Sequence, residues 1–363
     1  MNERAWNFSP GPGALPLPVL EQVRDEIVEL PGAGASILEI SHRSDAFERV
    51  IEEAEANLRE LLSIPDTHRV LFLQGGASLQ FTMVPMNLML SAADYVVTGS
   101  WGKKAFAEAA VRGEARLVWD GAETGFTAVP DTLDGLSAKA DYLHVTSNET
   151  IEGVEFPGGF EPGGGPPLVC DASSDFLSRP IPVERYGLLY AGAQKNAGPA
   201  GLAVVVLRDD LLETIPRGVP TMLDYRTFAE HRSLYNTPPV FAIYVLMLVT
   251  RWLSDAIGGL DAMAKLNEEK AATLYAAIDG SAGFYRGVAA PASRSRMNVT
   301  FRLPDEELQR AFVRQAAEEG LLELGGHRSV GGVRASIYNA MPIEGVQALT
   351  EFMERFRAAR SRP

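Results

Sequence analysis

The chain has 363 residues, of which 46% are hydrophobic and 22% are charged, a composition that excludes a disordered protein and suits about two globular domains. It has 33 lysines and arginines against 47 aspartates and glutamates, and its net charge of −14 argues against binding to a nucleic-acid backbone. A small anionic ligand is not excluded, because a local group of arginines can override the overall charge.

Cysteine occurs once, as Cys170, which excludes an internal disulfide framework and makes a cysteine-based zinc site implausible, so no metal is expected. The N-terminal residues lack the apolar core of a signal peptide. The longest apolar run, Val240 to Val249, is shorter than the roughly 20 residues that a membrane-spanning helix needs. We therefore expect a cytoplasmic protein that binds neither membranes nor nucleic acids.

Seven short apolar runs alternate with helical patterns through the first two thirds of the chain. Many are too apolar for half-exposed strands, which favours a mostly parallel sheet covered by helices on both faces. The runs are 70–74, 94–100, 115–120, 141–148, 167–173, 186–194 and 201–207. Helices are predicted at 78–90 and at 103–113, the second ending at Gly113, and a glycine- and proline-rich loop is predicted at 156–167.

The pattern changes after about residue 255. A long amphipathic segment at 254–280 is followed by a strand at 297–304, a helix at 305–320, a strand at 333–339 and a closing helix at 346–360. We predict an α/β protein with a large domain over residues 16–255. A smaller α+β domain follows over residues 256–363, joined by the N-terminal residues 1–15.

Two charged residues lie at the ends of buried runs. Lys195, one of six lysines, is the only charged residue between Tyr186 and Leu207. Desolvation lowers the pKa of such a lysine and suits it to form a Schiff base with an aldehyde; the alternative is a surface lysine in a loop. Asp171 ends the run at 167–171, where its carboxylate can pair with a buried cation such as a protonated pyridine nitrogen; the alternative is a helix cap or turn residue.

Gly75 and Gly76 separate the run at 70–74 from a helical pattern. Backbone N–H groups at a helix start bind phosphate, but many turns look like this one, and the spacing matches neither the P-loop nor the dinucleotide pattern. Trp101, just after the run at 94–100, is either a core residue or a ring that stacks on a cofactor.

Two His-Arg pairs occur among glycines and serines, His42 with Arg43 and His327 with Arg328, while Arg334 lies on the segment 333–339. One such pair is typical of a solvated surface, but two of them in an acidic protein favour an anion-binding site. A buried lysine, an aspartate, a phosphate loop and an aromatic ring together suggest pyridoxal phosphate as the cofactor.

Segments along nearly the whole chain resemble phosphoserine aminotransferase, a family of fold-type I pyridoxal-phosphate enzymes among the class V aminotransferases. They are NFSPGPGALP, EISHRS, LFLQGGASLQFTMVPMNL, HVTSNETIEGVEF, VCDASSDFLSRP, AGAQKNAGPAG, SLYNTPPVFAIY and GGHRSVGGVRASIYNA. The combination of AGAQKNAGPAG with SHRS and GGHRS is specific. The resemblance implies a large domain with a mostly parallel seven-stranded sheet and a smaller α+β C-terminal domain.

The resemblance also implies how the cofactor is bound. Lys195 forms the covalent link and then moves the substrate Cα proton, while Asp171 pairs with the pyridine nitrogen. Trp101 stacks on the ring, and Thr150 bonds the 3-oxygen. The residues implied for the cofactor phosphate are Gly76, Ala77 and Gln194, joined by Asn236 and Thr237 from the neighbouring subunit.

For the substrate, the resemblance implies that Arg334 binds the α-carboxylate. The residues implied for the substrate phosphate, or for the side-chain carboxylate of glutamate, are His42, Arg43, His327 and Arg328. Ser78 stands where one branch of the family carries an arginine for this phosphate, so the phosphate site is expected to hold fewer charges here.

The implied reaction transfers the amino group of L-glutamate to 3-phosphohydroxypyruvate, giving O-phospho-L-serine and 2-oxoglutarate, in a homodimer with shared active sites. The phosphohydroxythreonine step of pyridoxal phosphate synthesis stays open as a second reaction. The alternatives are another class V enzyme, such as a serine– or alanine–glyoxylate aminotransferase, and a protein that binds the cofactor without turnover. A desulfurase is disfavoured because the only cysteine, Cys170, lies in a buried run beside Asp171.

Overall fold

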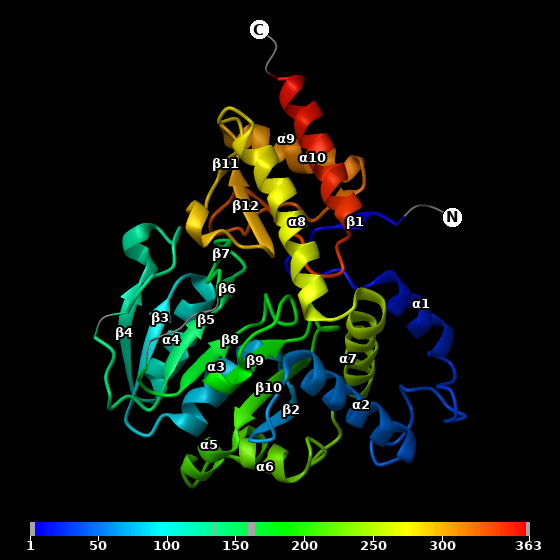
Figure 1. Ribbon diagram of the computed structural model, residues 1–363, viewed down its shortest axis with the longest axis vertical. Coiled ribbons are helices and arrows are strands. Elements are labelled where there is room, and N and C mark those ends of the chain that lie inside the picture. The colour runs from blue at the N-terminus through cyan, green and yellow to red at the C-terminus, as the bar shows by residue number, and fades with distance from the viewer. Residues whose placement is uncertain (1–3, 134, 159–163, 361–363) are drawn as a thin grey trace.

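The computed structural model describes residues 4–133, 135–158 and 164–360. A seven-stranded sheet forms the centre of its larger part (Figure 1). The strands are β2 (His68–Gln74), β3 (Ala92–Val97), β4 (Glu114–Asp120), β5 (Leu143–Thr146), β8 (Leu168–Asp171), β9 (Tyr186–Gly192) and β10 (Leu202–Arg208). Their order across the sheet is β2-β10-β9-β8-β5-β3-β4.

The sheet confirms the predicted strands, since each of the seven apolar runs overlaps one of them. Neighbouring strands pair in parallel, except that β10 runs antiparallel to both β2 and β9. The sheet is therefore mostly parallel, as expected. Because the carboxyl ends of its parallel strands lie at one edge, the loops that follow β2, β3, β5, β8 and β9 meet there.

Alternate residues of the strands enter two different cores, one on each face of the sheet. In β10, Val204 and Val206 belong to one core, whereas Val205 and Leu207 belong to the other. Helices cover both faces: the first core takes residues from α1, α2 and α7, and the second takes residues from α3, α4, α5 and α6. Their bounds are α1 (Leu17–Glu26), α2 (Asp45–Leu62), α3 (Gly76–Leu88), α4 (Ser100–Arg112), α5 (Asp209–Thr214), α6 (Tyr225–Glu230) and α7 (Val240–Trp252).

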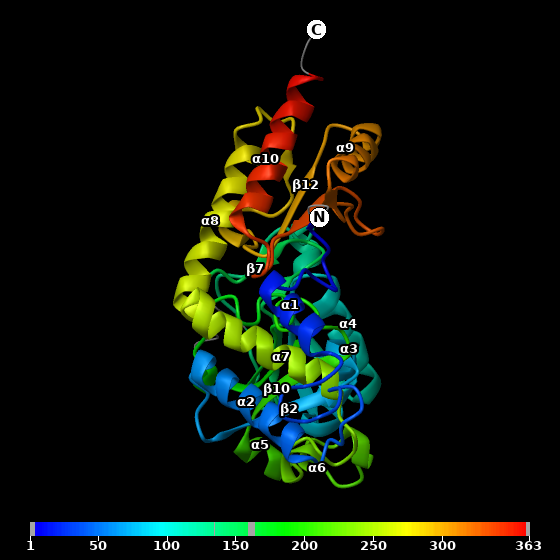
Figure 2. The ribbon, with the colours of Figure 1, turned by 90° about the vertical axis from the view of Figure 1, so that its right-hand side faces the viewer.

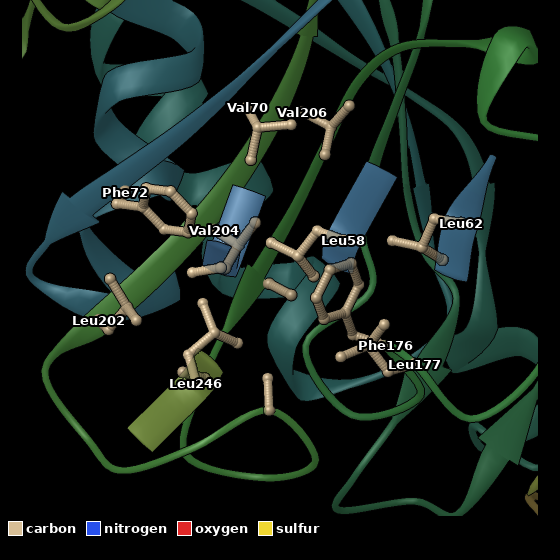
Figure 3. Packing of buried hydrophobic residues seen from close by; sticks show 14 of the residues in the cluster. Leu58, Leu62, Val70, Phe72, Phe176, Leu177, Leu202, Val204, Val206 and Leu246 are labelled. Carbon is tan, nitrogen blue, oxygen red and sulfur yellow. The ribbon is translucent and has the colours of Figure 1, made fainter. Parts of the chain in front are cut away.

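Helix α2 shows why these residues form a covering helix. Its cap, Ser44, accepts a hydrogen bond from the backbone N–H of Phe47, and Ser63 ends it in the left-handed region with φ 51°. Its buried residues recur every three or four positions, so they face the sheet together. Figure 3 shows Leu58 and Leu62 of this helix in the same core as Val204 of β10.

Helix α7 contains the longest apolar run of the chain. The stretch Val240–Ile257, which joins α7 to a wider helical turn at Leu253–Ile257, has a mean hydropathy of 1.6 and is long and apolar enough to cross a membrane. However, 56% of it is buried, and α7 packs on α2 in the first core. A core helix explains these apolar side chains, and the expectation that the run does not span a membrane stays a prediction.

A second group of elements combines the N-terminal strand β1 with elements that follow α7. It comprises β1 (Trp6–Asn7), α8 (Leu260–Asp279), β11 (Arg286–Gly287), β12 (Asn298–Arg302), α9 (Glu306–Glu318), β13 (Leu321–Leu322), β14 (Val333–Ser336) and α10 (Ile343–Ala358). Strands β11, β12 and β14 form an antiparallel sheet, and β1 pairs in parallel with β13. Both ribbon views place α9 and α10 at the opposite end of the molecule from α5 and α6 (Figures 1 and 2).

A third core belongs to this group alone, and it includes Phe8 from the N-terminal segment. The separate core supports the predicted division into residues 16–255 and 256–363 with 1–15, which stays a prediction. Within the predicted helical segment 254–280 the helix is broken, because Gly258 and Gly259 adopt φ values of 87° and 89° and α8 begins only after them. In the predicted loop 156–167, residues 159–163 lie outside the described part of the chain.

Candidate active site

A cavity of about 410 Å³ opens at the carboxyl edge of the large sheet. It is lined by residues that follow β2, β3, β5, β8 and β9, together with Gly11 and Pro12 from the N-terminal segment. This is where open α/β sheets bind ligands. Among the residues that line it, only Asp171 and Lys195 carry a formal charge. The structure therefore brings the two residues predicted at separate strand ends into one cavity.

Lys195 is a buried lysine in the turn that follows β9, with 7% of its surface exposed. Its Nζ donates a hydrogen bond to Oγ1 of Thr150 at 2.6 Å. Burial lowers its pKa to about 8, while the negative charges of Asp171 and Glu149 oppose this shift. The neutral, nucleophilic amine is therefore much more populated near neutral pH than in an ordinary lysine, at roughly a tenth of the side chains at pH 7.

Asp171 is the last residue of β8 and is almost fully buried. The backbone N–H and the hydroxyl of Ser173 both donate to its Oδ1, at 2.9 and 2.5 Å. Burial raises the pKa of this carboxyl group, while Ser173 and the charge of Lys195 lower it. Because the desolvation cost falls when a cation pairs with the carboxylate, this residue is suited to hold a positively charged group in the cavity.

The turn between β2 and α3 meets the requirements of an anion site. Gly75 and Gly76 adopt φ values of 86° and 61°, a left-handed backbone that favours glycine, and α3 begins at Gly76 without a side-chain cap. The amides of Gly76, Ala77 and Ser78 are therefore at a helix N-terminus that lines the cavity. Gln194 lines it as well, and its buried Oε1 forms no hydrogen bond within the described residues.

Trp101 lies in the first turn of α4 and lines the cavity, with its ring centroid 5.7 Å from Lys195 Nζ. Two glutamates that we did not predict hold this turn. Glu149 accepts hydrogen bonds from the backbone N–H groups of Trp101 at 3.0 Å and Gly102 at 2.7 Å. Glu152 accepts from the amide and the hydroxyl of Ser100. Their position beside Thr150 in the segment SNETIEG was the only sequence signal for them.

Arg334 of β14 comes from the other group of elements and contacts Thr150, the hydrogen-bond partner of Lys195, without lining the cavity. It is 5% exposed, its Nη1 donates to the carbonyl of Thr150 at 3.2 Å, and its Nε is buried without a partner within the described residues. Burial lowers the pKa of His327, and the nearby charges of Arg334, Lys104 and Arg328 lower it further. Arg334, Lys104 and Arg328 therefore lie within electrostatic reach of His327.

Eight predicted site residues do not line this cavity within one chain. Thr150, His327, Arg328 and Arg334 are near it through the contacts and charges above, whereas four others are not. His42 and Arg43 lie in the loop before α2, and the Nε2 of His42 is buried without a hydrogen-bond partner in the described part of the chain. Asn236 and Thr237 lie beside the end of β2, where the carbonyl of Thr237 accepts a hydrogen bond from Gln74 at 2.9 Å. None of the four lines the cavity, so their roles stay predictions.

The residues present fit the predicted cofactor. The cavity combines the Lys195 amine with its lowered pKa, a buried carboxyl group at Asp171, backbone amides at the start of α3, the ring of Trp101 and a Gln194 Oε1 that has no partner within the described residues. An aldehyde, a protonated ring nitrogen, a phosphate and an aromatic ring would each find a matching group.

Comparisons with known proteins agree with this geometry. The family model described as "Aminotransferase class-V" matches residues 5–349. Phosphoserine aminotransferase of Laribacter hongkongensis is 55% identical over 97% of this chain and 98% of its own length. The structure of phosphoserine aminotransferase from Bacillus circulans subsp. alkalophilus is 49% identical, with a TM-score of 0.96 over 99% of this chain and 100% of that one. The structure of phosphoserine aminotransferase from Trichomonas vaginalis with bound PLP is 40% identical, with a TM-score of 0.89 over 97% and 100% of the two chains.

Proposed function

The chain belongs to the class V aminotransferase family, and on that premise we propose that it is a phosphoserine aminotransferase. It transfers the amino group of L-glutamate to 3-phosphohydroxypyruvate and yields O-phospho-L-serine and 2-oxoglutarate, with pyridoxal phosphate as its cofactor. The observation that carries the proposal is the buried Lys195 amine in one cavity with Asp171 and the open N-terminus of α3.

The chain's own residues would hold the cofactor at each end. The amides of Gly76 and Ala77 and the side chain of Gln194 suit its phosphate, and Asp171 suits its ring nitrogen. When bound, pyridoxal phosphate supplies an electrophilic carbon and a ring that accepts the negative charge left on a deprotonated substrate. Trp101 closes one side of the cavity, which keeps water away from these groups.

Lys195 performs the proton transfer. Because burial lowers its pKa to about 8, its Nζ can take the proton from the substrate Cα and release it again at neutral pH. General acid–base catalysis of this kind typically contributes roughly 10²–10⁴-fold to the rate. The hydrogen bond to Thr150 holds Nζ inside the cavity.

The substrate must present two anionic groups. We infer that the buried Arg334 binds the α-carboxylate. A guanidinium group can donate two parallel hydrogen bonds to a carboxylate, and the Nε of Arg334 lacks a partner within the described residues. His327 and Arg328 lie beside it and suit the phosphate or the distal carboxylate. A glyoxylate aminotransferase would have no use for these cations.

We also infer a homodimer, because Asn236, Thr237, His42 and Arg43 do not line the cavity of their own chain. A second copy supplying these residues would complete both the cofactor and the substrate sites. The cytoplasmic location expected from the sequence stays a prediction, and the additional step in pyridoxal phosphate synthesis stays open.

The test is substitution of Lys195. Lys195→Ala should lower the rate of amino transfer from glutamate by about 10³-fold or more, because both nucleophile and base are lost. After borohydride reduction, peptide mapping should find the cofactor on Lys195 of the wild-type protein and on no residue of the variant. Lys265→Ala, at an exposed position of α8, is the matched control and should keep full activity.

Two results would contradict the proposal. Transamination by Lys195→Ala at the wild-type rate would show that Lys195 is not the base. A wild-type enzyme that prefers glyoxylate to 3-phosphohydroxypyruvate as amine acceptor would instead support the alternative class V activity.

A further inference from the structure

Lys104 contacts the ring of Trp101, which lines the cavity, and it has no role in the function derived so far. It follows Trp101 by three residues on α4, so both side chains share one face of the helix. Its Nζ lies 4.0 Å from the centroid of the Trp101 ring, in a cation–π contact, whereas its side chain is otherwise exposed. The ring that lines the cavity therefore also carries an ammonium group over it.

This ammonium has no anionic partner within the described residues, where Lys104 forms no hydrogen bond or ion pair. Glu108, one helical turn away, accepts a hydrogen bond from Thr82 instead. Glu149 and Glu152 accept hydrogen bonds from the amides at the start of α4. A cation in an acidic protein, near carboxylates that are engaged elsewhere, is available for an external anion.

Other cations lie close to Lys104. Its charge lowers the pKa of His327, together with those of Arg334 and Arg328, so these groups of β14 and of the loop before it lie within electrostatic reach of α4. Like charges gathered beside a cavity repel one another unless an anion lies between them. Inside the cavity the lining offers no cation except Lys195, and Ser78 at the start of α3 is uncharged.

We propose that Lys104 is a specificity-determining residue that binds the distal anionic group of the substrate and favours a phosphate dianion over a carboxylate. The proposal rests on the proposed function. An ammonium acts as a compact point charge, whereas a guanidinium fork fits both groups by shape. Because the Coulomb energy grows with ligand charge, and a phosphate monoester carries about −1.5 to −2 at pH 7, the gain is about twice as large for phosphate.

The experiment compares three amine donors in the first half-reaction of the holoenzyme, followed by the absorbance of the cofactor. O-phospho-L-serine carries a distal dianion, L-glutamate a distal monoanion, and L-alanine no distal charge. For Lys104→Gln we expect kcat/KM to fall about tenfold with phosphoserine. This is the effect of losing one charge-assisted hydrogen bond at an exposed position, where solvent weakens the interaction. Because the distal charge of glutamate is about half that of phosphoserine, the lost interaction energy is about half as large, and kcat/KM should fall about threefold. The value for alanine, which has no distal charge, should not change.

Two further variants define the cause. Lys104→Arg keeps the charge and should recover most of the rate with phosphoserine. Lys103→Gln, the neighbouring exposed lysine of α4, is the matched control and should behave as the wild type with all three donors.

The outcomes separate this inference from the proposed function. If Lys104→Gln loses rate equally with all three donors, the lysine acts through Trp101 and not on the substrate anion, and the inference is wrong. Unchanged selectivity in Lys104→Gln, with normal wild-type turnover of phosphoserine, overturns this inference alone. A wild-type enzyme that does not accept phosphoserine overturns the proposed function and the inference together.

Discussion

Two buried lysines of this chain show how the same side chain serves two purposes. Lys195 has a hydroxyl partner in a cavity, whereas Lys270 of α8, with 2% of its surface exposed, donates to the carbonyls of Ile337, Tyr338 and Met341 at 2.8–3.0 Å. Three acceptors use all three protons of an ammonium group. Lys270 therefore anchors the segment after β14 to α8. Its role is to hold the fold together, whereas the role proposed for Lys195 is in the reaction.

The buried position of Lys270 predicts how the free energy of unfolding depends on pH. Burial lowers its pKa from 10.5 to about 7, so between these values the unfolded chain binds one more proton than the folded one. The free energy of unfolding should therefore rise with pH across this window, by on the order of 2 kcal/mol between pH 7 and pH 9. Lys270→Met should lose this increase, which urea unfolding at pH 7, 8 and 9 would measure.

The Lys270→Met variant should also be less stable than the wild type at pH 8, because the buried carbonyls that accept hydrogen bonds from Lys270 lose their donor, at roughly 1–3 kcal/mol. Lys265→Met, at an exposed position of the same helix, should follow the wild-type pH dependence. Parallel curves for the wild type and Lys270→Met would show that this lysine keeps its ordinary pKa in the folded protein.

At the scale of elements, α4 depends on a segment about 50 residues away. Its first amides are held by the carboxylates of Glu149 and Glu152, on either side of the residue Thr150 that contacts Lys195. Burial and mutual repulsion raise the pKa of Glu149. One short segment thus sets both the start of α4, with its Trp101 ring, and the position of the Lys195 amine.

This arrangement predicts the effect of removing Glu149. Glu149→Ala leaves the amides of Trp101 and Gly102 without an acceptor and should lower the free energy of unfolding by about 1–3 kcal/mol. It should also weaken cofactor binding, measured by titration of the apoenzyme, because the ring of Trp101 is no longer held. Glu318→Ala, at an exposed position of α9, should change neither quantity. Normal cofactor affinity in Glu149→Ala would show that Trp101 is positioned by its other contacts.

At the scale of the whole molecule, the proposed dimer determines which chain completes each site. Lys195 lines the cavity of its own chain, whereas Asn236 does not. If the second copy supplies Asn236, a mixed dimer of Lys195→Ala and Asn236→Ala chains contains one site with both defects and one site with none. Mixing the two inactive variants under conditions that exchange subunits should therefore restore activity.

Each mixed dimer should regain one of its two sites, so that its activity approaches half of the wild-type value per dimer. If Asn236 acts on its own chain, every site in the mixture carries one defect and no activity returns. Mixing Lys195→Ala with wild-type chains is the control, since it creates no new intact site. A protein that is fully active as a monomer in sedimentation would exclude shared sites altogether.

Local sequence patterns predicted a large part of the fold. Each buried strand was visible as an apolar run, because a strand covered on both faces needs no polar alternation. The ends of those runs, together with the family motifs, also identified Lys195 and Asp171 as candidates for the site. The break at Gly258 and Gly259 was missed, because an amphipathic pattern on either side of two glycines looks continuous.

The sequence by itself determined which residues are buried strands and which charged residues end them, since both depend on neighbours along the chain. The tertiary structure alone decided that β10 runs antiparallel, that Glu149 holds the start of α4 and that Lys104 lies over Trp101 near His327. Apart from the contact of Lys104 with Trp101 on one helix, these relations join residues that are far apart in the chain. The packing of the elements against one another sets the distances between them, and no local pattern encodes that packing.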